Sequence, residues 1–179
     1  MFNYSSFRRI AFILISCLFQ FNAVFSQIDF GPNAQYKYLK GSEASALADT
    51  WMNIGFDDAA WASGTAPIGY DTENENAGIG TILDDMQNTY STVYMRGTFT
   101  VTDINLVSLI ELGADFDDGF IVWGNGERLH GVNDPDPPDY NSYSSGQHEN
   151  GAFEYFVFDS TEIELHEGEN LIAVQGFNT

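Results

Sequence analysis

Short runs of alternating apolar and polar residues recur along this chain, and most of them end at turn-forming residues. The clearest run is 91–101 (STVYMRGTFTV). Successive side chains of a β-strand point to opposite faces, so this alternation predicts a strand with one face toward a core. The predicted core-facing residues of this strand are Val93, Met95, Phe99 and Val101. Apolar residues do not recur at helical spacing over any long segment, and the pattern therefore predicts an all-β fold.

Six further segments have strand-like patterns: 35–40, 106–114, 119–123, 127–130, 153–159 and 170–177. Asn125-Gly126 lies between two of them and predicts a type I′ hairpin, because both positions of that turn need a positive φ. Two long, acidic and turn-rich stretches, 68–87 and 132–151, predict surface loops. The segment 56–61 (FDDAAW) predicts one helical turn that plugs one end of a sandwich with Phe56 and Trp61.

The first 26 residues have the layout of a secretory signal peptide. Arg8 and Arg9 precede an apolar run without charges, and Val24-Phe25-Ser26 provides a cleavage site ahead of Gln27. The apolar run is interrupted by polar residues and is short for a membrane span. We therefore expect export to the periplasm, the cell surface or the medium of a bacterium.

Cys17 raises one alternative, a lipoprotein signal that ends at this residue. The residues after Cys17 are apolar, whereas a lipidated cysteine is normally followed by a polar tether, so cleavage before Gln27 is the preferred interpretation. Residues 27–179 then form one β-sandwich domain. Cys17 is the only cysteine of the chain, so no disulfide can support this domain.

The charge balance excludes several partners. Removal of the leader leaves four Lys and Arg residues against 26 Asp and Glu residues, a formal net charge of −22. A surface of this sign repels nucleic acid and anionic lipid, so neither is an expected partner. It permits calcium binding without being evidence for it.

Four segments occur in an order that resembles a known family: 51–70, which ends in FDDAAWASGTAPIGY, 93–101 (VYMRGTFTV), 117–128 (DDGFIVWGNGER) and 167–178 (EGENLIAVQGFN). The chain resembles the jelly-roll, galactose-binding-domain-like β-sandwich of secreted bacterial multidomain proteins. It is also similar to the non-catalytic sandwich domain of glycoside hydrolase family 2. The resemblance covers nearly the whole chain after the leader, and it implies an antiparallel β-sandwich with a supporting role and no shared catalytic residue.

The sequence departs from the family pattern at two places. Gly124 stands where the pattern usually has a larger residue, which predicts looser packing there. The pattern also normally continues past QGFN into a turn and a final strand, whereas the sequence ends at Thr179. We therefore expect a domain that is truncated at its C-terminal end, or an open sheet edge that another segment must cover.

Asp115, Asp117 and Asp118 are candidate calcium ligands, because calcium is bound by six to eight oxygens. The preferred alternative is structural: the aspartates cap a tight turn by hydrogen bonds to the backbone, and Gly119 adopts a positive φ. A calcium loop of the EF-hand type would need a glutamate where Gly126 stands.

Exposed aromatic residues near loops are candidates for carbohydrate binding: Trp123, Tyr140, Tyr143 and His148. The alternative for Trp123 is burial, since its strand is otherwise apolar. The three histidines lack zinc-ligand spacing, and no nucleophile–base motif is present, so catalysis by this chain is not expected.

The sequence thus predicts an exported, all-β, non-catalytic accessory module, with carbohydrate as a possible ligand. Two alternatives stay open at this point. One is the front part of a secreted hydrolase whose catalytic domain lies beyond residue 179. The other is a structural or adhesion domain stabilised by calcium.

Overall fold

The computed structural model describes residues 12–16, 34–71, 78–149 and 151–179. The described residues form strands and two short 3-10 turns, η1 (Gly41–Glu43) and η2 (Ile104–Leu106). The strands are β1 (Phe12–Ser16), β2 (Gln35–Lys40), β3 (Ala62–Thr65), β4 (Ile68–Gly69), β5 (Thr81–Ile82), β6 (Thr92–Val101), β7 (Leu109–Asp115), β8 (Gly119–Gly124), β9 (Glu127–Val132), β10 (Glu154–Asp159) and β11 (Gly168–Phe177). Within this part of the chain, no helix is long and apolar enough to cross a bilayer.

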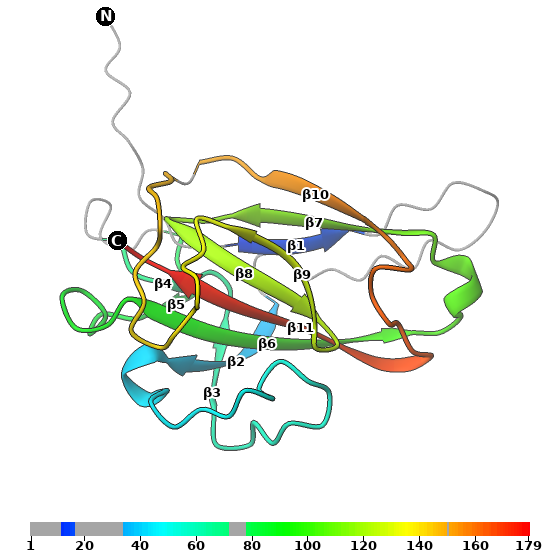
Figure 1. Ribbon diagram of the computed structural model, residues 1–179, viewed down its shortest axis with the longest axis horizontal. Coiled ribbons are helices and arrows are strands. Elements are labelled where there is room, and N and C mark those ends of the chain that lie inside the picture. Colours follow the sequence, from blue (N-terminus) through cyan, green and yellow to red (C-terminus); the bar gives the residue numbers. More distant parts are fainter. Residues whose placement is uncertain (1–11, 17–33, 72–77, 150) are drawn as a thin grey trace, which may run out of the picture.

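The strands form two facing layers (Figure 1). One layer is a six-stranded antiparallel sheet in the order β3-β2-β6-β11-β8-β9, and the other is a three-stranded antiparallel sheet in the order β1-β7-β10. Strands β4 and β5 add a small parallel pair. The all-β, antiparallel β-sandwich predicted from the sequence is confirmed.

Most predicted strands lie within one or two residues of the observed ones. The exception is 106–114, because Ile104–Leu106 forms η2 and the strand begins only at Leu109. The Asp103 carboxylate accepts a hydrogen bond from the Asn105 amide at 2.9 Å, which favours the turn over an extended backbone. Asn125 and Gly126 have φ values of 50° and 97°, as the predicted hairpin between β8 and β9 requires.

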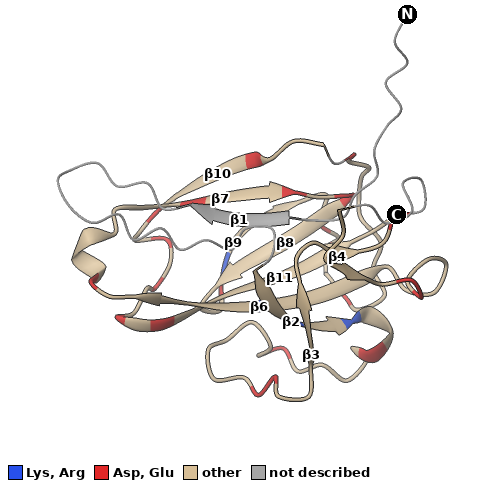
Figure 2. Ribbon diagram, turned by 180° about the vertical axis from the view of Figure 1, so that it is seen from behind, with Lys and Arg blue, Asp and Glu red and all other residues tan. Residues whose placement is uncertain are grey.

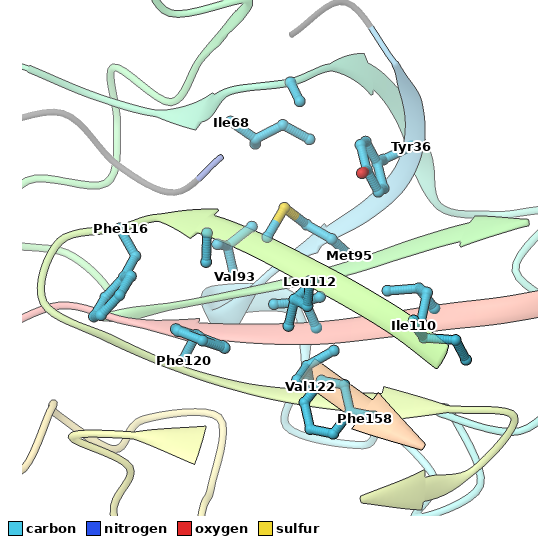
Figure 3. Packing of buried hydrophobic residues seen from close by; sticks show 14 of the residues in the cluster. Tyr36, Ile68, Val93, Met95, Ile110, Leu112, Phe116, Phe120, Val122 and Phe158 are labelled. Atoms are coloured by element: carbon cyan, nitrogen blue, oxygen red, sulfur yellow. The ribbon is translucent and has the colours of Figure 1, made fainter. Parts of the chain in front are cut away.

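The main core lies between the two layers. Figure 3 shows side chains of both sheets pointing toward one another, among them Val93 of β6, Leu112 of β7 and Phe120 of β8. Val93 and Met95 contribute to this core, while Tyr94 points to the other face of the sheet. The alternation predicted for 91–101 is therefore confirmed for these residues.

A second apolar cluster covers the outer face of the six-stranded sheet. It comprises Ala44, Trp51, Trp61, Tyr94, Ile121, Trp123, Leu171, Ala173 and Phe177. The segment after η1, coloured cyan in Figure 1, supplies the covering residues and lies on the side of this sheet away from β7 and β10.

The predicted plug at 56–61 is wrong in its location. Phe56 and Trp61 contact each other edge to face, with ring centroids 5.9 Å apart. However, Trp61 belongs to this outer cluster and Phe56 packs against it, so neither lies at an end of the sandwich. The segment forms one hydrogen-bonded turn, in which the Trp61 amide donates to the Asp58 carbonyl at 2.9 Å.

Two expectations about glycines are also wrong. A Cβ at Gly124 would lie 3.0 Å from the Ile163 side chain, so packing there is tight and not loose. The φ of Gly119 is not positive. A Cβ at Gly119 would instead lie 2.8 Å from the Val132 carbonyl oxygen, so the residue permits a close approach of two backbones.

Strand β1 lies within the predicted leader and pairs antiparallel with β7, from Phe12 opposite Asp115 to Ser16 opposite Glu111. The leader and its cleavage before Gln27 stay predictions. Cleavage at that site would remove β1 and leave one edge of β7 unpaired.

Candidate functional site

A cavity of about 430 Å³ lies over the outer face of the six-stranded sheet. Its floor comes from three neighbouring strands, and its walls come from the segments around residues 44–52 and 138–140. The residues that line it are Ala44, Ser45, Leu47, Asp49, Trp51, Met52, Tyr94, Trp123, Pro138, Asp139, Tyr140 and Gln175. A volume of this size is within the range typical of small-ligand sites.

The floor is formed by Tyr94 of β6, Trp123 of β8 and Gln175 of β11. Tyr94 lies directly opposite Gln175 in the register of the two strands. The Gln175 side chain is only 3% exposed, and its Nε2 donates to the Tyr94 hydroxyl and to the Asp139 carbonyl oxygen, each at 3.0 Å. Among the hydrogen bonds of the described residues, the Tyr94 hydroxyl receives this donor and has no acceptor, and the Gln175 side-chain carbonyl receives no donor. Within the described part of the chain, both atoms therefore keep hydrogen-bonding capacity that no protein group uses.

One wall is built on Trp51. Its ring packs edge to face on Tyr94 and on Trp123, with centroid distances of 5.0 and 5.1 Å. The backbone behind this ring is held by Arg96 of β6, whose guanidinium donates to the carbonyls of Trp51 and Asn53. The strand thus fixes the position of the wall.

Arg96 itself is 5% exposed. Its Nε donates to the Asp58 carboxylate at 2.7 Å, and its guanidinium carbon lies 5.2 Å from the centroid of the Phe56 ring. One buried cation therefore joins four residues of the 51–58 segment to the sheet.

The opposite wall is the segment 138–142. Hydrogen bonds hold it to the first residue of β6 and to the residue that precedes this strand. The Thr92 hydroxyl donates to the Tyr140 carbonyl at 2.5 Å, and the Ser91 hydroxyl donates to the Ser142 carbonyl at 2.6 Å. The Asp139 carboxylate accepts a hydrogen bond from the Tyr140 amide at 2.6 Å. This wall is therefore preformed.

Two carboxylates, Asp49 and Asp139, lie at the cavity. The pKa of the Tyr94 phenol is raised above its ordinary value. Burial is the larger cause, and the negative charge of Asp139 is the smaller one. Tyr94 consequently stays protonated at physiological pH and keeps its hydroxyl hydrogen as a donor. Together, the cavity lining offers aromatic surface, two phenols, the hydroxyl of Ser45, one amide carbonyl and two carboxylates, a set suited to a ligand with apolar faces and several hydroxyl groups.

The structure brings together two of the four predicted carbohydrate-binding residues. Trp123 and Tyr140 line the cavity. Tyr143 is 67% exposed, and neither it nor His148 is among the residues that line the cavity. Three lining residues, Asp49, Tyr94 and Gln175, were not predicted from the sequence, although a glutamine inside the apolar run NLIAVQGF was a signal for Gln175.

The predicted calcium ligands lie away from this cavity, and two of them bond the backbone. The Asp118 carboxylate accepts from the amides of His148 and Thr179, at 3.2 and 2.8 Å. The Asp115 carboxylate accepts from the Gly151 amide at 2.9 Å. Among the described residues, no group of three or more His, Cys, Asp or Glu side chains is placed to hold a metal. The calcium site stays a prediction and plays no part in the proposal below.

His148 joins its loop to the turn that carries Asp115, Asp117 and Asp118, which we call the acidic turn. Its ring stacks on Phe116 with centroids 4.0 Å apart, and its two nitrogens lie 3.0 Å from the Phe116 carbonyl oxygen and 2.7 Å from the Glu154 carboxylate. Burial lowers the pKa of His148, but the hydrogen bonds to Glu154 and Phe116 outweigh it, and the net shift is upward. Protonated His148 donates to both acceptors.

The stability contribution of His148 is expected to depend on pH. Because folding raises its pKa, the contribution is complete below the unfolded-state pKa and is lost as the pH rises through the folded-state pKa. Replacement by glutamine should therefore lower the free energy of unfolding more at pH 5.5 than at pH 8.5. The difference should be up to about 1 kcal/mol, the scale of an exposed ion pair.

Urea denaturation of both proteins across this pH range measures the effect. Glu154→Gln removes the same ion pair from the other side and should show the same trend. A pH-independent difference for both variants would rule out the ion pair as its cause.

Comparisons with known proteins give the fold but no sequence family. The sequence matches no protein-family model and no curated protein. The structure is similar to part of Bacteroides uniformis β-glucuronidase 2, with 18% identity and a TM-score of 0.52 over 82% of this chain and 14% of that chain. It is also similar to part of a β-glucuronidase from an uncultured Clostridium sp., with 14% identity and a TM-score of 0.50 over 99% of this chain and 24% of that chain.

The chain thus spans about a quarter or less of the length of these enzymes, and it has the fold of one part of them.

Proposed function

We propose that this chain is a non-catalytic accessory module of an exported protein and that it binds carbohydrate in the cavity over its six-stranded sheet. The observation that carries the proposal is the composition of this cavity. Three aromatic rings, of Trp51, Trp123 and Tyr140, lie around the buried amide of Gln175 and the phenol of Tyr94.

The chemistry of this set fits a sugar. A pyranose ring presents C–H groups on its faces and hydroxyl groups at its edge. Tyr140, which is half-buried at the wall, offers a ring surface for the C–H groups. The Tyr94 hydroxyl, the Gln175 carbonyl and the Asp139 carboxylate offer one donor and several acceptors for the hydroxyls.

The rigidity of the site also supports binding. Both walls are fixed to β6 before a ligand arrives, one through Arg96 and the other through Thr92. A preformed site loses little conformational entropy when it binds, which favours affinity for a small ligand.

The accessory role is supported by the extent of the structural likeness. The chain has the fold of a segment that makes up 14–24% of two β-glucuronidases. The sequence resemblance to a non-catalytic sandwich domain points the same way. The module would place or attach a neighbouring domain near its glycan.

Replacing Tyr140 with alanine is expected to weaken glycan binding at least about tenfold, since Tyr140 is the one half-buried aromatic ring among the lining residues, whereas Trp51, Tyr94 and Trp123 are buried. Tyr143→Ala is the matched control: it removes an equal ring three residues away, outside the cavity lining, and should leave binding unchanged. Binding is first located on a glycan array with the purified protein and then measured by calorimetry.

Thermal melting of both variants tests whether each is folded. Equal losses in the two variants, or binding of no glycan by the unchanged protein, would refute the proposed site.

A further inference from the structure

We propose that the cavity selects sugars without a carboxylate and excludes uronic acids. This inference rests on the proposed function and narrows it to a ligand class. It also separates this chain from the enzymes that share its fold, which are β-glucuronidases. Four observations about charge and hydrogen bonding carry it.

The described cations are all engaged elsewhere. Lys40 pairs with Asp85 at 2.8 Å, and Arg128 pairs with Asp134. Lys37 donates to the Trp61 carbonyl at 3.5 Å. Arg96, behind the Trp51 wall, already bonds Asp58 and two backbone carbonyls, and it is buried.

None of these four cations lines the cavity. Proteins bind a carboxylate tightly through charge-assisted hydrogen bonds, most often from an arginine or a lysine. The residues that line this cavity include no such group. A uronate placed here would therefore lose its hydration without gaining an ion pair.

The cavity also carries charge of the wrong sign for a uronate. Asp49 and Asp139 lie at its lining, and both are exposed. Figure 2 shows acidic residues distributed widely over the molecule, with few basic ones between them. The formal net charge of the whole chain is −20, so the surrounding field repels an anion as well.

The hydrogen-bonding capacity of the cavity points to hydroxyl groups. The two aspartates and the Gln175 carbonyl are acceptors, and the Tyr94 hydroxyl can donate. Acceptors bind groups that carry a hydrogen, which a sugar hydroxyl does and an ionised carboxylate does not. A neutral sugar unit can donate to these acceptors, whereas an ionised carboxylate cannot and could accept only from the neutral hydroxyls of Ser45, Tyr94 and Tyr140.

The test compares matched sugars that differ only at carbon 6. Oligosaccharides of glucose and galactose are titrated into the purified protein beside oligosaccharides of glucuronic and galacturonic acid, at one ionic strength. At least one neutral oligosaccharide should bind at least about tenfold more tightly than its uronate counterpart. Raising the salt concentration should narrow this ratio, because salt screens repulsion between exposed charges.

The double variant Asp49→Asn, Asp139→Asn should narrow the ratio of neutral-sugar to uronate affinity further. Each amide keeps the shape and one acceptor oxygen of the carboxylate, but it removes the negative charge and adds a donor. Asp84→Asn with Glu149→Gln is the matched control, because it removes two exposed acidic charges outside the cavity lining. The control should leave the ratio unchanged.

The outcomes separate the two proposals. A uronate that binds as tightly as its neutral counterpart would overturn this inference and leave carbohydrate binding intact. An equal narrowing in both double variants would also overturn it, because net charge rather than the cavity would then set the preference. Binding of neither class would refute the proposed function itself.

Discussion

Replacing Arg96 with methionine is expected to lower the free energy of unfolding by about 2–4 kcal/mol. Methionine keeps much of the apolar bulk of the side chain but donates no hydrogen bond. The carbonyls of Trp51 and Asn53 would lose their donor, and the Asp58 carboxylate would lose its cation. Asp58 stays partly hydrated, with 26% of its side chain exposed, so the loss falls below that of a fully buried pair.

The same substitution should also reduce glycan binding, because Arg96 holds the wall that carries Trp51. Urea denaturation followed by tryptophan fluorescence measures the stability loss. Arg96→Lys is the informative control: it keeps the charge, but one ammonium group cannot reproduce the planar set of donors, so an intermediate loss is expected. A loss below about 0.5 kcal/mol for the methionine variant, the scale of an ordinary surface substitution, would contradict this role of Arg96.

Replacing Phe120 with alanine is expected to lower the free energy of unfolding by about 3–5 kcal/mol, the usual range for a buried phenylalanine. Phe120 is 1% exposed and lies between the layers, with its ring centroid 4.8 Å from that of Phe116 and 6.0 Å from that of Phe156. Truncation would leave a cavity lined by rigid aromatic rings, which cannot collapse fully. Since the free energy of unfolding of natural domains is only about 5–15 kcal/mol, this substitution would remove a large part of it.

Tyr155→Ala is the matched control for this prediction. Tyr155 is an aromatic residue of β10 that is 57% exposed, so its truncation should change stability by no more than about 0.5 kcal/mol. Similar losses for the two variants would mean that the core does not lie between the sheets as described. Denaturation in urea distinguishes the two outcomes directly.

Most of the longer strands were predictable because each carries a local signal in the sequence. The alternation in β6 and the Asn125-Gly126 turn are properties of a few neighbouring residues, and the backbone obeys them. The short strands β3, β4 and β5 were missed, because segments such as ASGT have no apolar alternation. Pairing with neighbours, and not an intrinsic preference, makes them strands.

The cavity could be predicted only in part. Tyr94, Trp123 and Gln175 are distant in the sequence and become neighbours through the order β6-β11-β8, which no local pattern encodes. The outer cluster was also not predicted. A sheet face that a loop covers has the same apolar sequence pattern as a sheet face in the main core. Trp123 therefore satisfied both interpretations: it is buried, and it still lines the cavity.

The contacts of the acidic turn were also only partly predictable from the sequence. The sequence suggested that the aspartates cap this turn through hydrogen bonds to the backbone. Asp118 does accept from a backbone amide, but that amide belongs to Thr179, which is distant in the sequence. Nothing in the sequence indicated that His148 would stack on Phe116 and pair with Glu154, because the loop 132–151 has no periodicity to read. The geometry of a long loop depends on its contacts with the rest of the fold.

If the cavity over the six-stranded sheet is a carbohydrate site, a bound glycan must perturb the residues that line it. Chemical-shift mapping by NMR, with the glycan that the protein binds most tightly on the array, tests it most directly. Shifts are expected at the backbone amides of Asp49, Asp139 and Gln175 and at the indole of Trp123. Shifts confined to the acidic turn and its loop, or no shift with any glycan at saturating concentration, would contradict it.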